Sequence, residues 1–493
     1  MVSSRSMSSL FLKTYHSLPP FGRNLVASLR GVQLRRWRYS AGTERLVQEA
    51  LAREHWGEEQ WPKWEEERMA PLLDRAATRV PFYRGYWSQH NGPNGRKAWS
   101  VLENWPILKK EAVRSNPRAF VADDVDPKGL WETHTSGTTG TPIQLFHSKA
   151  AVEGRYALYE ARHRLWHGVT RHDRWGIIGG QPIVPRDQKR PPFWVWNATM
   201  NQLYLSAMHL ASWSAQAYLD AISKYRLQYL VGYSSSLYFL AREAKRIGQC
   251  LPVKAVVTNA EPLFGFQRQA IKEAFSGTVQ ETYGQAETVC CASECACGGL
   301  HLWPDMGKLE LLDKDGNEVA PGSPGQMVAT GLLDTAVPLI RYEIGDVGQL
   351  PQREAPCPCG RTLPLIEKIW GRLDDQIVTK DGRHAVLIDR IFDPPLRTKE
   401  GQIVQRGIDK FLLRVVPDER WTASDVQLLK RSLTEIVGDV DVEVRIVREI
   451  ERSWMGKARV IVSEMKSPIA LGTAGIASPT EHNESELSPA NSP

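Results

Sequence analysis

Long hydrophobic runs are absent from this chain of 493 residues. A helix that crosses a bilayer needs about 18 or more consecutive apolar residues, and no such stretch occurs. The first residues also lack the apolar centre and small-residue cleavage site of a signal peptide, so we expect a cytoplasmic protein without an integral membrane segment. The apolar and charged fractions are those of an ordinary globular protein, and the length predicts about two to four domains.

Acidic side chains are absent from residues 1–43. The same segment contains seven basic side chains: Arg5, Lys13, Arg23, Arg30, Arg35, Arg36 and Arg38. Because the whole chain carries a net charge of +6, the remainder is close to neutral, which argues against a nucleic-acid-binding protein. The segment favours a solvated, partly helical leader, and an arm that contacts a membrane surface or nucleic acid is the alternative.

Cysteine is absent outside residues 250–359, where all seven occur. A disulfide-stapled secreted protein would spread its cysteines through a shorter chain, so this crowding indicates metal binding. SECACGGLH and APCPCGRTLP lie about 60 residues apart and are a plausible tetrahedral zinc site; reduced cysteines without metal are the alternative. The favoured ligands are Cys295, His301, Cys357 and Cys359. Cys297 is the other candidate for the fourth position, and Cys250 is predicted to be a core cysteine.

The middle of the chain has the pattern of an α/β protein. Residues 45–125 show the amphipathic spacing of helices. From about residue 174, short apolar runs such as QYLVGY and VKAVVTNA alternate with helical segments such as SSSLYFLAREAKRIG. This alternation predicts a parallel sheet covered on both faces, whose ligands bind at the carboxyl ends of the strands.

The composition changes after GRLDD, residues 371–375. FLLRVV, VDVEVRIVREI and ARVIVSEM predict strands, and TASDVQLLKRSLTEIVG predicts a helix that begins with a capping box of Thr422 and Asp425. We therefore expect a large domain over 1–370, a small mobile α+β domain over 371–466, and a disordered Ser/Pro-rich tail over 467–493.

The stretch THTSGTTGTP, residues 133–142, is rich in glycine and small hydroxyl side chains. It lacks the Gly-Lys-Ser/Thr of a Walker-type phosphate loop, which excludes that class. Gly137 and Gly140 would nevertheless let the backbone approach an anion closely, and neighbouring hydroxyls would add donors. Taken alone, the stretch fits a phosphate-binding loop and a plain surface turn equally well.

Three further motifs favour the phosphate-binding loop over the surface turn. ETYGQAET offers an aromatic ring at Tyr283 and a carboxylate at Glu287; RYEIGD places Asp346 after an apolar strand; SWMGKARV presents Lys457 just past a glycine. The ordered series SGTTG, YGxxE, RYxxGD, GRxDD and GK resembles that of the adenylate-forming superfamily. The closest resemblance is to the phenylacetate–CoA ligase family, in its capsule-biosynthesis-associated branch, and it extends from the helical leader to about residue 465.

This resemblance implies an ATP site. The β- and γ-phosphates would be held by Ser136, Gly137, Thr138, Thr139, Gly140 and Thr141. Asn259, Ala260 and Glu261 would lie along the adenine, and Tyr283, followed by Gly284, would stack on it. Asp346, assisted by Arg372, would bind the ribose. Many superfamily members have Lys where this chain has Thr141, so one positive charge on the leaving phosphates is missing here.

The resemblance also implies catalytic roles and a conformational step. Glu287 would ligate the Mg²⁺ that bridges the phosphates, and Lys457 would bridge the substrate carboxylate and the α-phosphate; with Thr139 they form the implied catalytic set. The small domain would rotate at Asp374, so that Lys457 faces the site only during adenylation. Some family members carry a structural zinc at the cysteine-rich region, and Cys290 and Cys291 are expected near the nucleotide.

The expected activity is the ATP-dependent, AMP-forming activation of a carboxylic acid, followed by transfer to coenzyme A. There are two alternatives to this activity. The same adenylation could be followed by transfer to an amine or hydroxyl acceptor or by AMP transfer, or the chain could be a non-catalytic nucleotide-binding subunit. Residues 191–212, PPFWVWNATMNQLYLSAMHLAS, suit a pocket for an aromatic or apolar acid and equally well a buried core. A homodimer is possible, and no nucleic-acid partner is expected.

Overall fold

The computed structural model describes residues 9–57, 59–90, 98–135, 142–353, 355–372, 377–380, 384–385, 391–392, 397–452 and 460–465. The chain divides into two compact units: Met1–Leu373 with Arg452–Ala458, and Asp374–Glu451 with Arg459–Pro493. In the part of the chain that is described, no helix has both the length and the apolar character needed to cross a bilayer.

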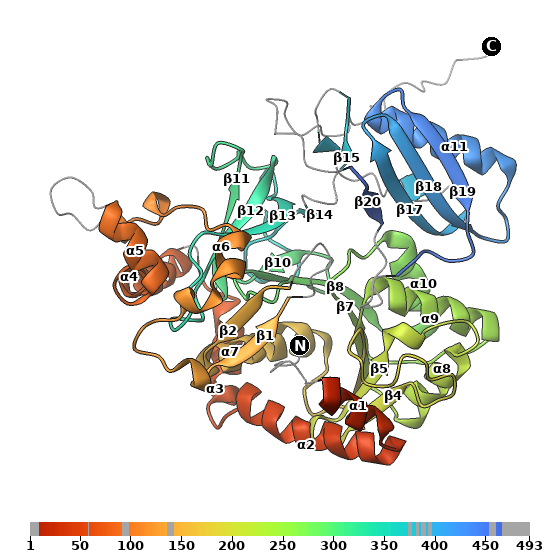
Figure 1. The fold of residues 1–493 in the computed structure, drawn as a ribbon, viewed down its shortest axis with the longest axis horizontal. Coiled ribbons are helices and arrows are strands. Elements are labelled where there is room, and N and C mark those ends of the chain that lie inside the picture. The colour runs from red at the N-terminus through yellow and green to blue at the C-terminus, as the bar shows by residue number, and fades with distance from the viewer. Residues whose placement is uncertain are drawn as a thin grey trace, which may run out of the picture. The chain divides into compact units, whose positions relative to one another are not determined.

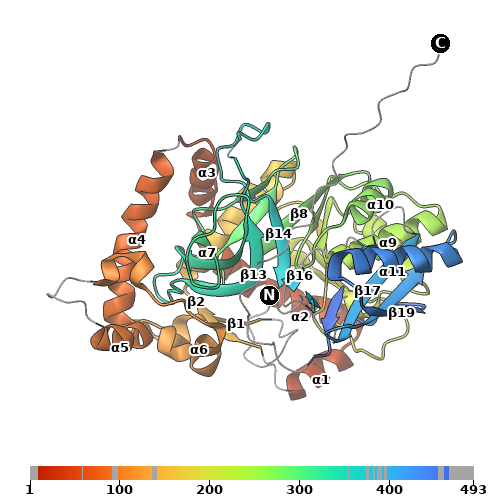
Figure 2. The same ribbon diagram turned by 90° about the horizontal axis from the view of Figure 1, so that it is seen from above.

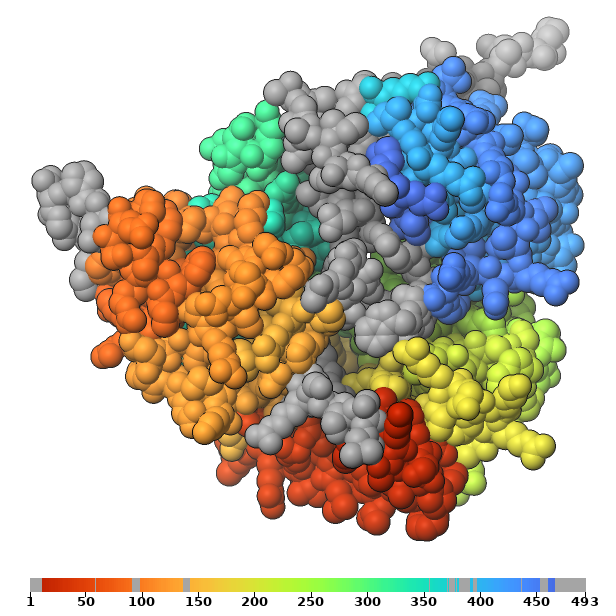
Figure 3. Space-filling model, viewed as in Figure 1, coloured from red at the N-terminus to blue at the C-terminus, as the bar shows by residue number. Residues whose placement is uncertain are grey.

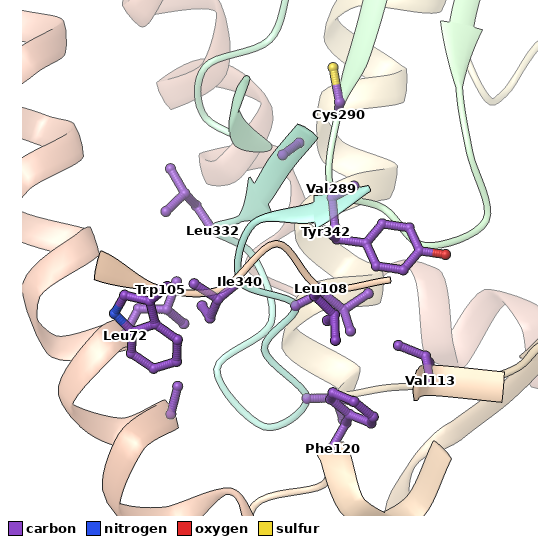
Figure 4. Packing of buried hydrophobic residues seen from close by; sticks show 14 of the residues in the cluster. Leu72, Trp105, Leu108, Val113, Phe120, Val289, Cys290, Leu332, Ile340 and Tyr342 are labelled. Carbon is purple, nitrogen blue, oxygen red and sulfur yellow. The ribbon is translucent and has the colours of Figure 1, made fainter. Parts of the chain in front are cut away.

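The first part of the large unit is helical, as the amphipathic spacing predicts (Figure 1). Its α-helices are α1 (Ser9–Ser17), α2 (Pro20–Arg38), α3 (Thr43–Arg53), α4 (Gln60–Arg79), α5 (Pro81–Gln89) and α6 (Lys110–Ser115). The apolar faces of α4 and α5 build one side of a core. Figure 4 shows Leu72 and Trp105 packed beside Ile340, and Phe120 in the same cluster, so residues distant in sequence share this core.

The large unit is organised around a sheet of eight strands in the order β10-β9-β8-β7-β6-β3-β5-β4. Its strands are β3 (Trp175–Gly179), β4 (Trp194–Asn197), β5 (Gln202–Ser206), β6 (Tyr229–Gly232), β7 (Ala255–Thr258), β8 (Thr278–Gly284), β9 (Cys291–Glu294) and β10 (Leu300–Leu302). The central strands β5, β3, β6, β7 and β8 are parallel, whereas β4, β9 and β10 run antiparallel to their neighbours.

Helices cover both faces of this sheet, which explains why the central strands β3, β6 and β7 are almost continuously apolar. One face packs on α8 (Ala215–Lys224), α9 (Ser234–Ile247) and α10 (Gly265–Phe275), which Figure 1 shows together beside the strands; Figure 2 shows α9 and α10 from above. On the other face, Arg164, which follows α7 (Lys149–Tyr159), donates to the Tyr229 hydroxyl at 2.9 Å and lies over Trp175. The predicted parallel α/β fold is confirmed.

Two smaller sheets complete the large unit. β1 (Trp131–His134) and β2 (Gln144–His147) form an antiparallel pair. An antiparallel sheet contains β11 (Gly307–Leu312), β12 (Pro324–Gly331), β13 (Tyr342–Gln349) and β14 (Lys368–Arg372). Within it, Asp346 of β13 pairs directly with Arg372 of β14 across the two backbones.

The small unit contains a four-stranded sheet of order β19-β18-β17-β20, packed against α11 (Ala423–Val437). Its strands are β17 (Thr398–Gly407), β18 (Lys410–Pro417), β19 (Asp441–Ile446) and β20 (Ile461–Ser463), and β15 (Ile377–Val378) pairs with β16 (His384–Ala385). The capping box of α11 is present: the Asp425 carboxylate accepts from the backbone N–H of Thr422 at 2.7 Å. Leu429 and Leu433 are fully buried against the sheet.

One expectation about a buried residue is wrong, and the structure supports one of two alternatives that the sequence left open. Cys250, predicted in the core, is exposed; it follows the C-cap Gly248 of α9, where the chain has left the apolar face of the helix, and its thiol lies 3.2 Å from the Ser276 hydroxyl. Within 191–212, Phe193, Leu203 and Leu205 have no exposed surface and belong to the sheet core. That region therefore packs mainly as core.

Candidate active site

The segment predicted to lie along the adenine follows the carboxyl end of β7. Ala260 has a left-handed backbone (φ +61°), which costs free energy for a residue with a Cβ and is typical of functional loops. The N-terminus of α9 fixes this shape: the N–H of Ser235 donates to the Glu261 carboxylate at 2.9 Å, and the Ser234 hydroxyl donates to the Glu261 carbonyl at 3.2 Å. The segment is thus held rigidly at the ligand-binding edge of the sheet.

Tyr283 and Gly284 end the adjacent strand β8, and Tyr283 links the eight-stranded sheet to the sheet of β11 to β14. Its hydroxyl donates to the Asp346 carboxylate at 2.6 Å. Burial, followed by the negative charge of Asp346, holds the pKa of Tyr283 well above its usual value, so the phenol remains a donor. Because Arg372 pairs with Asp346 in register, the structure brings together the three residues predicted around base and ribose.

Glu287 lies in the loop after β8 and is 8% exposed. Its carboxylate accepts from the Tyr342 hydroxyl at 2.7 Å, and Tyr342, fully buried at the start of β13, is drawn in Figure 4. The next residue, Thr288, has a left-handed backbone (φ +61°), and its hydroxyl accepts from Arg155 at 2.8 Å. The carboxylate is therefore oriented before any ligand arrives.

Sequence reasoning missed Tyr342 and Glu281, although both lie inside quoted motifs. Tyr342 is the second residue of RYEIGD, and only its contact with Glu287 reveals its importance. Glu281 precedes Tyr283 by two residues and accepts from the N–H of Leu263 at 3.3 Å, which ties β8 to the segment after β7. Burial, with a smaller contribution from Glu294, raises the pKa of the Glu281 carboxyl to about 7.

A small cavity borders Glu287 and Thr288. Its walls are largely apolar, with Val113, Phe120 and Leu339 among the lining residues. His147 adds a polar group whose Nδ1 lies 3.7 Å from the Asp334 carboxylate. Sequence patterns could not have located this cavity, because its walls come from segments far apart in the chain.

Four cysteine and histidine ligand atoms converge in the same unit. The groups are Cys295, His301, Cys357 and Cys359, and their ligand atoms all lie within 4.8 Å of one another. The Sγ atoms of Cys295 and Cys357 are 3.6 Å apart, and Cys359 Sγ lies 3.3 Å from His301 Nε2. Cys297 is exposed and is not a member of this group.

This donor set fits a zinc ion. Zinc–ligand bonds of about 2.0–2.3 Å in a tetrahedron require ligand atoms separated by roughly 3.3–3.8 Å. The Cys295–Cys357 and Cys359–His301 pairs lie in this range. The Nδ1 of His301 lies 3.0 Å from the Leu363 carbonyl, which would orient Nε2 toward the metal. Burial raises the pKa of the Cys295 thiol to about 12, so that thiol would ionise only beside a cation. Burial also lowers the pKa of His301, which keeps the imidazole neutral, as a ligand must be.

Several predicted site residues lie outside the described residues: Ser136, Gly137, Thr138, Thr139, Gly140, Thr141, Asp374 and Lys457. The two ends of the predicted phosphate loop are nevertheless described. The N–H of Thr135 donates to the Ile143 carbonyl at 3.0 Å, and the N–H of Ile143 donates to the Thr135 hydroxyl at 2.9 Å. The two residues that flank the loop, Thr135 and Ile143, are therefore hydrogen-bonded to each other beside the β1–β2 pair.

The folding pattern is that of the adenylate-forming ligases. The chain superposes on the crystal structure of 2-hydroxyisobutyryl-CoA ligase with a TM-score of 0.65 at 20% identity, covering 84% of this chain and 91% of that one. This likeness shows the fold. A search of protein-family models found no match.

Curated relatives identify the family. The chain is 30% identical to phenylacetate-coenzyme A ligase of Escherichia coli over 326 residues, which cover 64% of this chain and 71% of that protein. It is 24% identical to Protein CapK of Staphylococcus aureus over 461 residues, covering 92% of this chain and 99% of that protein. The chain belongs to the phenylacetate–CoA ligase family, as the ordered motifs predict.

Proposed function

We propose that this protein activates a carboxylic acid with ATP and then passes the acyl group to coenzyme A. In the first step the carboxylate attacks the α-phosphorus, giving an acyl adenylate and releasing pyrophosphate. In the second, the thiol of coenzyme A attacks the acyl carbon and AMP leaves. The observation that carries the proposal is the 2.6 Å contact of Tyr283 with Asp346, which assembles two family motifs at the carboxyl end of the sheet.

The residues support a mechanism based on positioning and charge neutralisation. Two anions, a carboxylate and a polyphosphate, must meet, so fixed donors and cations carry most of the catalysis. Asp346 would take the ribose hydroxyls, with its orientation set by Tyr283. Glu287, oriented by Tyr342, would hold a Mg²⁺ ion that neutralises phosphate oxygens when bound. Lys457 would supply a compact positive charge between the carboxylate and the α-phosphate.

The acid itself we propose to be largely apolar. The aromatic residues of 191–212 no longer support this choice, because Phe193 and its neighbours are core. Support comes instead from the apolar side chains beside Glu287, which include Val113, Phe120 and Leu339; the cavity that they line is small, so it would have to widen to admit an acid. An enzyme that consumes ATP and coenzyme A, with seven free cysteines, would be expected to work in the cytoplasm.

A panel of carboxylic acids tests this function. Pyrophosphate release is measured with and without coenzyme A, and thioester formation is followed in parallel. We expect release with apolar acids and a thioester only when coenzyme A is present. Unchanged release without coenzyme A and no thioester would instead indicate an amine or hydroxyl acceptor or AMP transfer, and no release with any acid would indicate a non-catalytic nucleotide-binding subunit.

Tyr342→Phe removes the hydroxyl that orients Glu287, and it should weaken the response to magnesium. Loss of a group that orients a metal ligand commonly costs about tenfold to a hundredfold in metal affinity or activity. We expect the Mg²⁺ concentration for half-maximal pyrophosphate release to rise by about that factor.

The matched control is Tyr83→Phe. Tyr83 is equally buried and its hydroxyl also bonds within the core, to the carbonyl of Pro338 and the N–H of Ile340, but it does not contact Glu287. This variant should lose stability while its magnesium response stays at the wild-type value. An unchanged response in Tyr342→Phe would show that Glu287 does not hold the ion.

A further inference from the structure

Helix α2 presents an apolar stripe to solvent. Four side chains lie on it: Phe21 (75% exposed), Leu25 (58%), Leu29 (63%) and Val32 (40%). At about 100° of rotation per residue these positions fall within roughly a quarter turn of one another. Phe11 of α1 is 49% exposed as well. A surface helix normally turns such a stripe toward the core, so its outward position on α2 requires an explanation.

One flank of α2, about a quarter turn from the stripe, is held to the protein by polar groups. Asn24 accepts from the N–H of Trp196 at 2.9 Å, and Ser28 accepts from the N–H of Ala198 at 3.0 Å. Gly31 lies so close to the Asn197 side chain that a Cβ at this position would clash with it. These contacts fix the rotation of the helix about its axis. The apolar stripe faces solvent because this neighbouring flank is bonded to strand β4 and the turn after it.

Positive charge accompanies the stripe. Arg35 and Arg36 are exposed one turn beyond Val32, and among the described residues neither has an acidic partner. The loop beside α1 and α2, which is tied to Arg23 through Gln188 at 3.0 Å, adds further exposed cations. These are Arg186, Lys189 and Arg190, set against a single carboxylate at Asp187. Figure 3 shows α1 and α2 along one edge of the large unit.

We propose that α2 docks the protein onto the surface of an anionic lipid bilayer. A helix with apolar side chains on one face and arginines beside them lies in the interface plane, with its apolar face among the upper acyl chains. Lipid phosphates complement the arginines. A nucleic acid would match the charge but offers no partner for four apolar side chains. A second copy would bring like charges together, which disfavours self-pairing through this face.

Binding of the full-length protein to phospholipid vesicles tests the proposal. Co-sedimentation is measured with vesicles of phosphatidylglycerol mixed with phosphatidylcholine, and with phosphatidylcholine alone. We expect binding to the anionic vesicles that weakens as salt is raised, and about tenfold or more weaker binding to the neutral ones. Leu25→Gln with Leu29→Gln should lower partitioning about tenfold or more without changing net charge. Arg35→Gln with Arg36→Gln should lower it by a similar factor on anionic vesicles only.

A matched control replaces exposed apolar residues of the small unit, Leu428→Gln with Ile446→Gln, and should bind vesicles as the wild type does. Circular dichroism and pyrophosphate release in solution confirm that all variants are folded. The proposal is overturned if vesicles do not bind, or if the leucine variant binds like wild type, because charge alone would then suffice. It is equally overturned if light scattering shows a dimer that the leucine variant abolishes, or if duplex DNA binds through Arg35 and Arg36 while vesicles do not.

Discussion

Lys457→Ala is expected to slow acyl-adenylate formation by about a hundredfold or more and to leave thioester formation nearly intact. The proposed role of Lys457 is to neutralise charge between the carboxylate and the α-phosphate, which is needed only while that bond forms. Loss of one such contact typically costs on the order of 3 kcal/mol in the transition state. The half-reactions can be measured separately, by pyrophosphate release from ATP and by thioester formation from synthetic acyl adenylate and coenzyme A.

Asp374→Pro supplies the complementary variant. The resemblance implies a pivot at Asp374, and we propose that rotation at this residue withdraws Lys457 from the site after adenylation. Proline would stiffen the backbone there and should slow the second half-reaction while sparing the first. If Lys457→Ala slows both steps equally, the staged mechanism fails, although the nucleotide-binding motifs would still stand.

Cys357→Ser or Cys359→Ser should eliminate the metal and much of the stability of the protein. We propose roughly one zinc per chain, bound at the Cys295–His301–Cys357–Cys359 cluster. Binding free energy at a structural zinc site contributes to folding, so loss of one ligand should lower the unfolding temperature and the soluble yield rather than alter the choice of acid. Elemental analysis and thermal unfolding of the purified variants measure both effects.

Cys297→Ser is the matched control, because Cys297 lies in the same stretch but is exposed and outside the cluster. It should retain the zinc and the wild-type unfolding temperature. Wild-type protein that is purified without metal and is nevertheless normally stable would rule out the site. Loss of zinc from Cys297→Ser alone would place the fourth ligand at Cys297 instead of His301.

The sequence predicted features that depend on local patterns. Alternating apolar runs located β6 to β8 and the helices between them, and the spacing of Thr422 and Asp425 located the start of α11. Features that depend on contacts between side chains far apart in the chain could not be predicted from the sequence. The contact of Tyr342 with Glu287 spans 55 positions, and no periodicity encodes such a pairing.

For other residues, the sequence could not predict whether the side chain faces solvent or the core. The spacing of Phe21, Leu25 and Leu29 reveals an apolar stripe but not that polar contacts turn it outward. The sequence favoured a solvated, partly helical leader, with an arm for a membrane surface or nucleic acid as the alternative; the helix is present, and membrane contact stays a proposal. Cys250 is apolar enough for a core, yet it follows the end of α9, where the chain is at the surface. Phe193 belongs to the sheet core because the strands around it are covered by helices.

The attachment of α2 has a consequence for solubility. β4 is the last strand of the large sheet, and the outer edge of such a strand exposes backbone N–H groups that can pair with a strand of another molecule. Asn24 occupies the N–H of Trp196 on β4, and Ser28 occupies the N–H of Ala198 just beyond it. Residues 20–38 thus cover the exposed edge of β4 and keep it from pairing with another strand. A shortened chain without these residues would expose β4 as an unpaired edge strand. We expect such a chain to aggregate by pairing of β4 with an edge strand of another molecule.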